Sequence, residues 1–250
     1  MRRTYAIIIL LSCLLVPLHL AGQERTVQNK PYIDFRKLHF GVLVGTHLQD
    51  IEFVNAGPTV YVDDQGNEVH SMVSTDQSRW DPGFTVGVLA ELRLSTHFQF
   101  RFAPTLYFGT RHITYRNYTS TDTQGNPTET RQDMKTAYMA GNCELIFAAP
   151  RYNNHRPYLL AGISPMFNLS GNSGEYMKLK KTDVYLEVGV GCDFYLPFFK
   201  LRPELKFMYS IMDSYDSDYA NHVQDKNLLP YTLSVNEAHT KMIALTFYFE

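Results

Sequence analysis

Hydrophobic and polar residues alternate with a period of two along most of this 250-residue chain. In the stretch 183–196, DVYLEVGVGCDFYL, every second residue from Val184 onward is apolar, whereas acids, tyrosines and glycines occupy the positions between. A period of two places successive side chains on opposite faces of a β-strand. We therefore predict an all-β protein whose strands each have one apolar and one polar face.

Eight segments of the chain show this alternation, and each is longer than the roughly 5–6 residues usual for strands in globular proteins. Because about 9–11 residues of a tilted strand cross a bilayer, each segment is long enough to span a membrane. The predicted strands are residues 37–50, 82–95, 98–113, 135–149, 157–169, 181–196, 200–213 and 239–249.

The connections between these segments are alternately long and short. Short connections fall at 96–97, 150–156 and 197–199, and longer polar ones at 51–81, 114–134, 170–180 and 214–238. Outer-membrane barrels have this arrangement, with short turns in the periplasm and long loops outside the cell. We therefore predict an eight-stranded antiparallel transmembrane outer-membrane β-barrel with short periplasmic turns and long extracellular loops.

A soluble eight-stranded barrel would show the same alternation with its apolar face inward, so the composition of the two faces has to decide between them. The polar face carries charges together with small residues such as Gly45, Gly87 and Gly189, which suit a crowded interior. The apolar face is rich in large side chains such as Phe98 and Phe100, for which a narrow eight-stranded lumen has little room. We predict that the apolar face meets lipid.

The N-terminus has the layout of a secretory signal peptide, with Arg2 and Arg3 followed by an apolar run and small residues. We expect a signal peptide over residues 1–22, a periplasmic N-terminal segment over 23–36 and the barrel over 37–250. The protein is therefore expected in the cell outer membrane.

Three cysteines occur in the chain, and none suggests a disulfide framework. Cys13 lies within the apolar run, and we expect it to be removed with the signal peptide rather than lipidated. Cys143 and Cys192 fall on predicted strands separated by about 9–10 Å, which exceeds disulfide reach. We expect both to face lipid.

Composition refines this picture. The mean hydropathy of −0.24 is that of a soluble protein, but it averages two opposite faces of each strand. The formal net charge of −2 lacks the basic excess of nucleic-acid binders, so no nucleic-acid partner is expected.

Aromatic residues form 14% of the chain, and many gather at the predicted turn ends, like the girdles of outer-membrane barrels. The predicted girdle comprises Phe98, Phe147, Phe194, Phe198, Phe199, Phe247 and Phe249.

Charged residues on the predicted inner face nearly cancel one another. The tight turns set a register in which Glu91 faces Arg101 and Asp193 faces Arg202, and opposite charges across strands attract. In a narrow lumen these charges are desolvated and need partners. We predict a structural salt-bridge network that plugs the barrel, with an ion or proton path as the alternative. Its members are Glu91, Arg93, Arg101, Glu144, Glu187, Asp193, Arg202, Glu204 and Lys206.

No catalytic, cofactor or metal site is predicted. His112 lies near the outer end of a strand but has no serine two positions away on its face. His39 and His47 are about 26 Å apart along one strand and cannot share a metal. The acidic clusters of the long loops match no calcium-loop spacing, and we expect them to be solvated. These clusters contain Asp63, Asp64 and Glu68, and Asp213, Asp216 and Asp218.

Three prolines conflict with the strand assignment. Pro104, Pro165 and Pro203 each fall inside a predicted strand, where proline removes one hydrogen bond of the ladder. Bulges or local kinks are the expected way for a barrel to accommodate them.

Two sequence stretches resemble known families. LRPELKFMYSI (201–211) resembles a recurring strand of the small porin-family outer-membrane barrels of Bacteroidetes. KPYIDFRKLHFGVLVGTHLQDIEF (30–53) resembles the PorT, or SprT, family of accessory outer-membrane proteins of the type IX secretion system. The final residues, FYFE, resemble the C-terminal signal of barrel insertion, although Glu250 stands where phenylalanine is commoner.

The PorT resemblance implies an accessory role in protein export or assembly, with other type IX secretion components and outer-membrane lipid as partners. It implies no catalytic residues and no cofactor. The periplasmic segment with Tyr32, Asp34, Arg36 and Lys37 is a candidate contact surface, or else a solvated approach to the first strand. A lipid-modifying outer-membrane enzyme and a plain structural or adhesive barrel are the alternatives. The sequence does not indicate an oligomeric state.

Overall fold

The computed structural model describes residues 29–170, 176–223 and 225–250. The predicted signal peptide over 1–22, including Cys13, lies outside the described residues, as do residues 23–28 of the predicted periplasmic segment. No helix of the described residues is long and apolar enough to cross a membrane.

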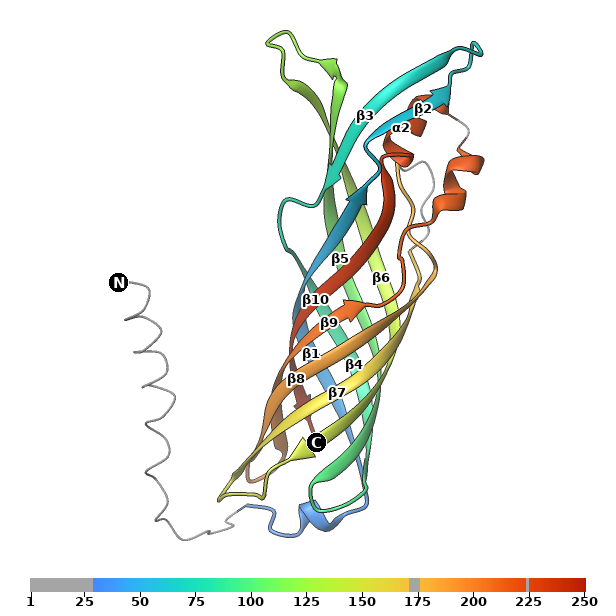
Figure 1. Ribbon diagram of the computed structural model, residues 1–250. Coiled ribbons are helices and arrows are strands. Elements are labelled where there is room, and N and C mark those ends of the chain that lie inside the picture. The colour runs from blue at the N-terminus through green and yellow to red at the C-terminus, as the bar shows by residue number, and fades with distance from the viewer. Residues whose placement is uncertain (1–28, 171–175, 224) are drawn as a thin grey trace, which may run out of the picture.

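Eight strands pair in antiparallel order and close into a barrel, which confirms the predicted fold (Figure 1). Around the ring, each strand pairs with the next one along the chain, and the first pairs with the last. The C-terminus lies at the same end of the barrel as the short turns, as an even strand count requires. The eight strands are β1 (Leu38–Asn55), β4 (Asp81–Arg93), β5 (Phe98–Thr121), β6 (Pro127–Ala148), β7 (His155–Asn168), β8 (Thr182–Tyr195), β9 (Lys200–Ser210) and β10 (Val235–Phe249).

The apolar face of the strands points outward, as predicted. Val188 on β8 and Phe100 on β5 are exposed, whereas the intervening Glu187 and Arg101 are buried. On β5 the outward apolar side chains run from Phe98 to Phe108. Ten residues at about 3.4 Å each, tilted by roughly 40°, span about 26 Å, close to the apolar band of outer-membrane barrels. The outward face therefore has the height of the hydrocarbon layer.

Two of the predicted loops are largely strand. The hairpin of β2 (Pro58–Val62) and β3 (Glu68–Asp76) occupies most of 51–81, and β3 pairs with the outer end of β5. β5 and β6 also continue through most of 114–134. These extensions stand beyond the membrane, where neither face needs an apolar band. Their sequences are polar and therefore resemble loops, but they contain threonine and tyrosine, which favour strands.

Two hairpin tips share a turn sequence, DDQGN and DTQGN. The carboxylates of Asp63 and Asp122 each accept hydrogen bonds from the backbone N–H groups two and four residues later. The hydrogen bond from the Asn67 N–H is the main cause that lowers the pKa of Asp63 below its ordinary value. Asp63 therefore stabilises its turn. Among the described residues, no group of three or more histidine, cysteine, aspartate or glutamate side chains could hold a metal ion.

The three prolines fit their strands without the expected bulges. The ladder between β4 and β5 is interrupted beside Pro104, yet the register is the same on both sides of the gap. Pro165 and Pro203 interrupt the ladders of β6 with β7 and of β8 with β9 in the same way. Each proline thus loses pairing to one neighbour only, and the barrel wall keeps its register.

The extracellular end is closed by a hydrophobic core built from the extensions and loops. It contains Ile51, Ile113, Tyr115 and Tyr215, all nearly inaccessible to solvent. The described part of the long connection before β10 contributes three short helical elements to this region. They are η3 (Ser217–His222), η4 (Lys226–Leu228) and α2 (Leu229–Thr232).

Candidate functional site

A layer of charged side chains fills the periplasmic half of the barrel. Four cations and six carboxylates point inward, and none of their side chains is more than 2% exposed. Burying so many charges is tolerated only where they pair closely and are hydrogen-bonded. The members are Arg101, Lys200, Arg202 and Lys206, with Glu91, Glu144, Glu187, Asp193, Glu204 and Glu250.

Arg101 on β5 is the centre of this layer. Its Nη1 lies 2.9 Å from Glu144 Oε2 and 2.8 Å from Glu204 Oε2, and its Nε lies 3.3 Å from Glu91 Oε2. The guanidinium also stacks 4.4 Å from the ring centroid of Tyr248, a favourable cation–π geometry. Glu91 and Glu144 lie directly across the ladder on the two neighbouring strands, as the tight turn between β4 and β5 implied for Glu91.

Arg202 and Lys206 on β9 extend the network across the lumen. Arg202 Nε lies 2.6 Å from Asp193 Oδ1, and its Nη1 lies 2.5 Å from Glu91 Oε2. Lys206 Nζ lies 2.8 Å from Glu144 Oε1 and 3.6 Å from Glu187 Oε2. Glu91 and Glu144 therefore tie β9 to β4, β5 and β6 on the opposite wall.

The sequence reasoning missed two members of the network, Lys200 and Glu250. Glu250 forms ion pairs with Arg202 and Lys200, and the backbones of Lys200 and Glu250 exchange hydrogen bonds at the periplasmic end. His39 Nδ1 also lies 3.6 Å from Glu250 Oε2. A signal was present, because Tyr248 points inward and Phe249 outward, so the alternation places Glu250 inward. Glu250, which stands where phenylalanine is commoner, thus joins Lys200 and Arg202 in one network.

Arg93 lies apart from the network to which it was assigned. It is half-buried at the end of β4, its Nε donates to the Ser95 backbone carbonyl, and its guanidinium lies over the ring of Phe35. Its position on the inward-facing alternation is correct. However, at this level the strand reaches the periplasmic rim, where side chains turn toward water.

Apolar and aromatic clusters pack beside the charges and on their extracellular side. Toward the outside lies a cluster that includes Tyr107, Tyr138, Tyr185 and Met208. At the level of the charges, Tyr158 packs with Ile146, Ala148 and Leu160, and its hydroxyl donates to Glu204 Oε2. Buried clusters of described side chains thus lie in the barrel at the level of the charges, above them and at the extracellular end.

The N-terminal segment is fastened to the periplasmic rim. Asp34, in the short helix η2 (Ile33–Phe35), accepts a hydrogen bond of 2.6 Å from the Tyr195 hydroxyl and lies 3.6 Å and 3.8 Å from the guanidiniums of Arg151 and Arg156. The side chain of Asn29 donates to the backbone carbonyl of Tyr195.

The residues proposed for the periplasmic contact surface therefore divide into two sets. Asp34 faces the barrel, contrary to its assignment to that surface, because two arginines offset its charge there and a tyrosine hydroxyl donates a hydrogen bond to it. Tyr32, Arg36 and Lys37 are exposed, and Tyr32 is 77% accessible.

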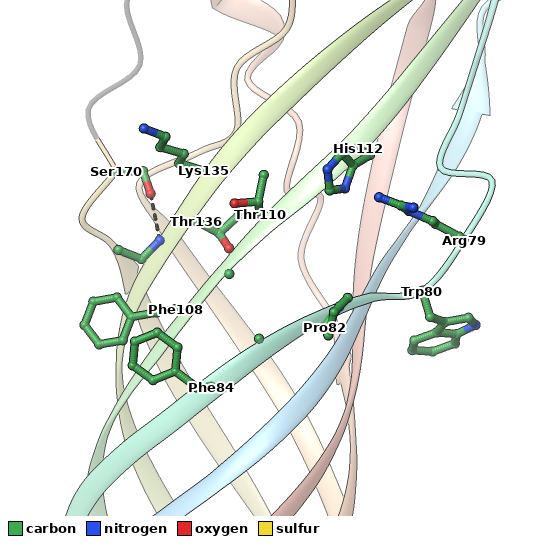
Figure 2. A pocket seen from close by; sticks show the side chains of 13 residues that line it. Arg79, Trp80, Pro82, Phe84, Phe108, Thr110, His112, Lys135, Thr136 and Ser170 are labelled. Atoms are coloured by element: carbon green, nitrogen blue, oxygen red, sulfur yellow. Dashed lines mark hydrogen bonds between the residues drawn. The ribbon is translucent and has the colours of Figure 1, made fainter.

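His112 and His47 each contact a group other than a serine hydroxyl. His112 Nδ1 lies 2.8 Å from Asp81 Oδ1, and its Nε2 lies 3.8 Å from Asp133 Oδ1. The Ser170 hydroxyl accepts a hydrogen bond from the Ala137 N–H, and Figure 2 shows it on the far side of a pocket from His112. His47 points into the barrel and contacts the hydroxyl of Thr85.

Comparisons with known proteins place these features in a family. Residues 23–216 match the family model described as outer membrane protein beta-barrel domain. No curated protein matches this sequence.

Similar solved structures include three outer-membrane or surface proteins. OprG of Pseudomonas aeruginosa is 10% identical with a TM-score of 0.47, covering 85% of this chain and 94% of that chain. Neisserial surface protein A is 13% identical with a TM-score of 0.40, covering 85% and 98%. Ail of Yersinia pestis, solved with the heparin analogue sucrose octasulfate, is 11% identical with a TM-score of 0.36, covering 86% and 99%. Since the family model matches most of the sequence, the chain belongs to the outer membrane protein beta-barrel domain family and resides in the outer membrane.

Proposed function

We propose that this protein is an accessory barrel of the type IX secretion system, which anchors export components in the outer membrane and neither conducts solutes nor catalyses a reaction. The filled interior carries this proposal, because buried ion pairs and aromatic layers occupy the space that a channel would need. The resemblance of residues 30–53 to the PorT family supplies the link to type IX secretion. Such a protein would contact its partners with its periplasmic and extracellular ends.

The periplasmic end offers a defined contact surface. Asp34 and Asn29 hold the N-terminal segment against the rim, and Tyr32 and Phe35 on that segment are 77% and 67% exposed. Exposed aromatic side chains on a fixed backbone are typical anchors of protein–protein interfaces, because little conformational entropy is lost on binding. We assign this segment, with the flanking Arg36, as the surface that meets another secretion component.

Deleting the gene in a host with type IX secretion is expected to abolish export of cargo proteins that carry type IX sorting signals. Restoring the wild-type gene should restore export, whereas the Tyr32→Ala/Phe35→Ala variant should leave most cargo in the periplasm, since its barrel folds but lacks the contact surface. The measurement is the share of cargo in the medium by immunoblot, with heat-modifiable migration as the check on folding.

The matched control is Phe198→Ala, which removes an aromatic side chain that is 90% exposed at another periplasmic turn. It should export cargo like wild type. Normal export in the deletion strain would overturn the proposed role. Normal export by the double variant alone would remove the periplasmic segment from it.

In planar bilayers the purified protein is expected to give no stepwise currents. Ion pairs of the charged layer and the aromatic cluster above it join described side chains across the lumen, so we expect no continuous water path for ions. Single-channel recording at increasing voltage checks this, with a general porin as the positive control. Regular conductance steps would contradict the proposed closed barrel and favour the ion-path alternative.

A further inference from the structure

The outer surface of the barrel has a pocket where the pairing partner of β5 changes from β3 to β4. β3 pairs with β5 as far as Asp76, and β4 takes its place beside β5 only from Gly83. The link between β3 and β4 leaves a pocket of about 810 Å³ over β4, β5 and β6 (Figure 2). Pro82, Phe84 and Phe108 line it, and the two rings stack with centroids 4.9 Å apart.

The pocket lies where the apolar band ends. On β5 the outward side chains change from Phe108 to Thr110 and then His112, and on β6 they change from Met139 to Lys135. Trp80, a residue type that concentrates at membrane–water interfaces, also lines the pocket. One half of the pocket therefore faces hydrocarbon and the other half faces the headgroup region of the outer leaflet.

The headgroup side of the pocket carries positive charge. Lys135 is exposed, and its ammonium has no ion-pair partner within the described residues. Arg79 is 63% exposed, and its Nε forms the ion pair with Asp81. Its two Nη groups take no part in that ion pair. The Ser170 hydroxyl accepts from Ala137 and keeps its own proton to donate.

The acidic groups near this site are already engaged or do not line the pocket. Asp81 is fully buried and accepts hydrogen bonds from Arg79, His112 and Gln77. Asp133 is 70% exposed, lies beside His112 Nε2 and is not among the residues that line the pocket. The charge offered to a ligand at the mouth of the pocket is therefore positive.

We propose that this pocket binds a phosphorylated lipid of the outer leaflet. Arg79 and Lys135 lie on opposite sides of the pocket (Figure 2), so each would hold a separate phosphate of the headgroup. Charge-assisted hydrogen bonds to a phosphate are the strongest that a partly hydrated site offers. An acyl chain would lie over Phe84 and Phe108. A free anion would use only the cationic half, and an uncharged lipid only the aromatic half, whereas a phosphorylated lipid matches both.

Trp80, the single tryptophan of the chain, reports directly on this pocket. The probe is bisphosphorylated lipid A titrated into the full-length barrel in detergent micelles, with Trp80 emission as the readout. We expect a saturable change for the wild-type protein, and about tenfold weaker binding for Lys135→Gln, as loss of one charge-assisted hydrogen bond predicts. Lys181→Gln, which removes an exposed lysine next to β8, should bind like wild type.

Each comparison in this titration decides one part of the proposal. Equal responses to lipid A and to its phosphate-free form would overturn phosphate recognition. The same saturable change with inorganic phosphate alone would overturn the lipid as ligand. Equal weakening by Lys135→Gln and Lys181→Gln would show general attraction rather than a site, and heat-modifiable migration checks that every variant is folded. This site is independent of the proposed secretion role, so either can fail alone.

Discussion

Replacing Arg101 with methionine is expected to lower the free energy of unfolding by about 3–5 kcal/mol, because the change leaves buried carboxylates without their cation. The Arg101 guanidinium contacts Glu91, Glu144 and Glu204, and all four side chains are fully buried. Methionine fills similar space but offers no positive charge. Urea titration in micelles, followed by Trp80 emission and by heat-modifiable migration, measures the change.

The matched control is Arg93→Met, on the same inward-facing alternation but at the periplasmic rim. Arg93 is only half-buried and donates to a backbone carbonyl, so its loss should change the free energy of unfolding by no more than about 0.5 kcal/mol. Arg101→Lys should fall between the two, since lysine keeps the charge but loses the planar fork that serves several carboxylates at once. Equal losses for Arg93→Met and Arg101→Met would contradict a network centred on Arg101.

The barrel and its faces could be predicted from sequence because a membrane imposes one rule on every strand. Each spanning strand has to present about ten residues of alternating apolar character, so the period of two survives in all eight. Tight turns then fix the register. Because the turn after β4 is short, the spacing of Glu91 and Arg101 along the chain is enough to place them opposite each other.

Features that depend on distant segments could not be predicted in this way. Asp34 is neutralised by Arg151 and Arg156, more than 100 positions later, and no local pattern joins them. The lateral pocket combines the β3–β4 link with β5, β6 and Ser170, so no single stretch of sequence contains it. The strands beyond the membrane escaped prediction for another reason, because water on their outer face removes the alternation that marks a spanning strand.

A positive charge at the centre of the lipid-facing surface should also be costly. Ile163 on β7 is 51% accessible and points outward midway between Pro157 and Phe167. Ile163→Arg would place a guanidinium near the bilayer midplane, where such a substitution in a β-barrel costs about 2–4 kcal/mol. We expect this loss in the free energy of unfolding in phospholipid vesicles, measured by denaturant titration of heat-modifiable migration.

Leu169→Arg provides the matched control at the outer edge of the same strand. Leu169 is 57% accessible and lies one residue beyond β7, close to Ser170 and the headgroup region, where arginine costs only about 0–1 kcal/mol. A soluble barrel with a solvated outer face would tolerate arginine equally at both positions. The difference between the two variants therefore measures the membrane itself. Equal stability of Ile163→Arg and Leu169→Arg in vesicles would mean that Ile163 does not face the hydrocarbon centre, and would contradict the position of the apolar band.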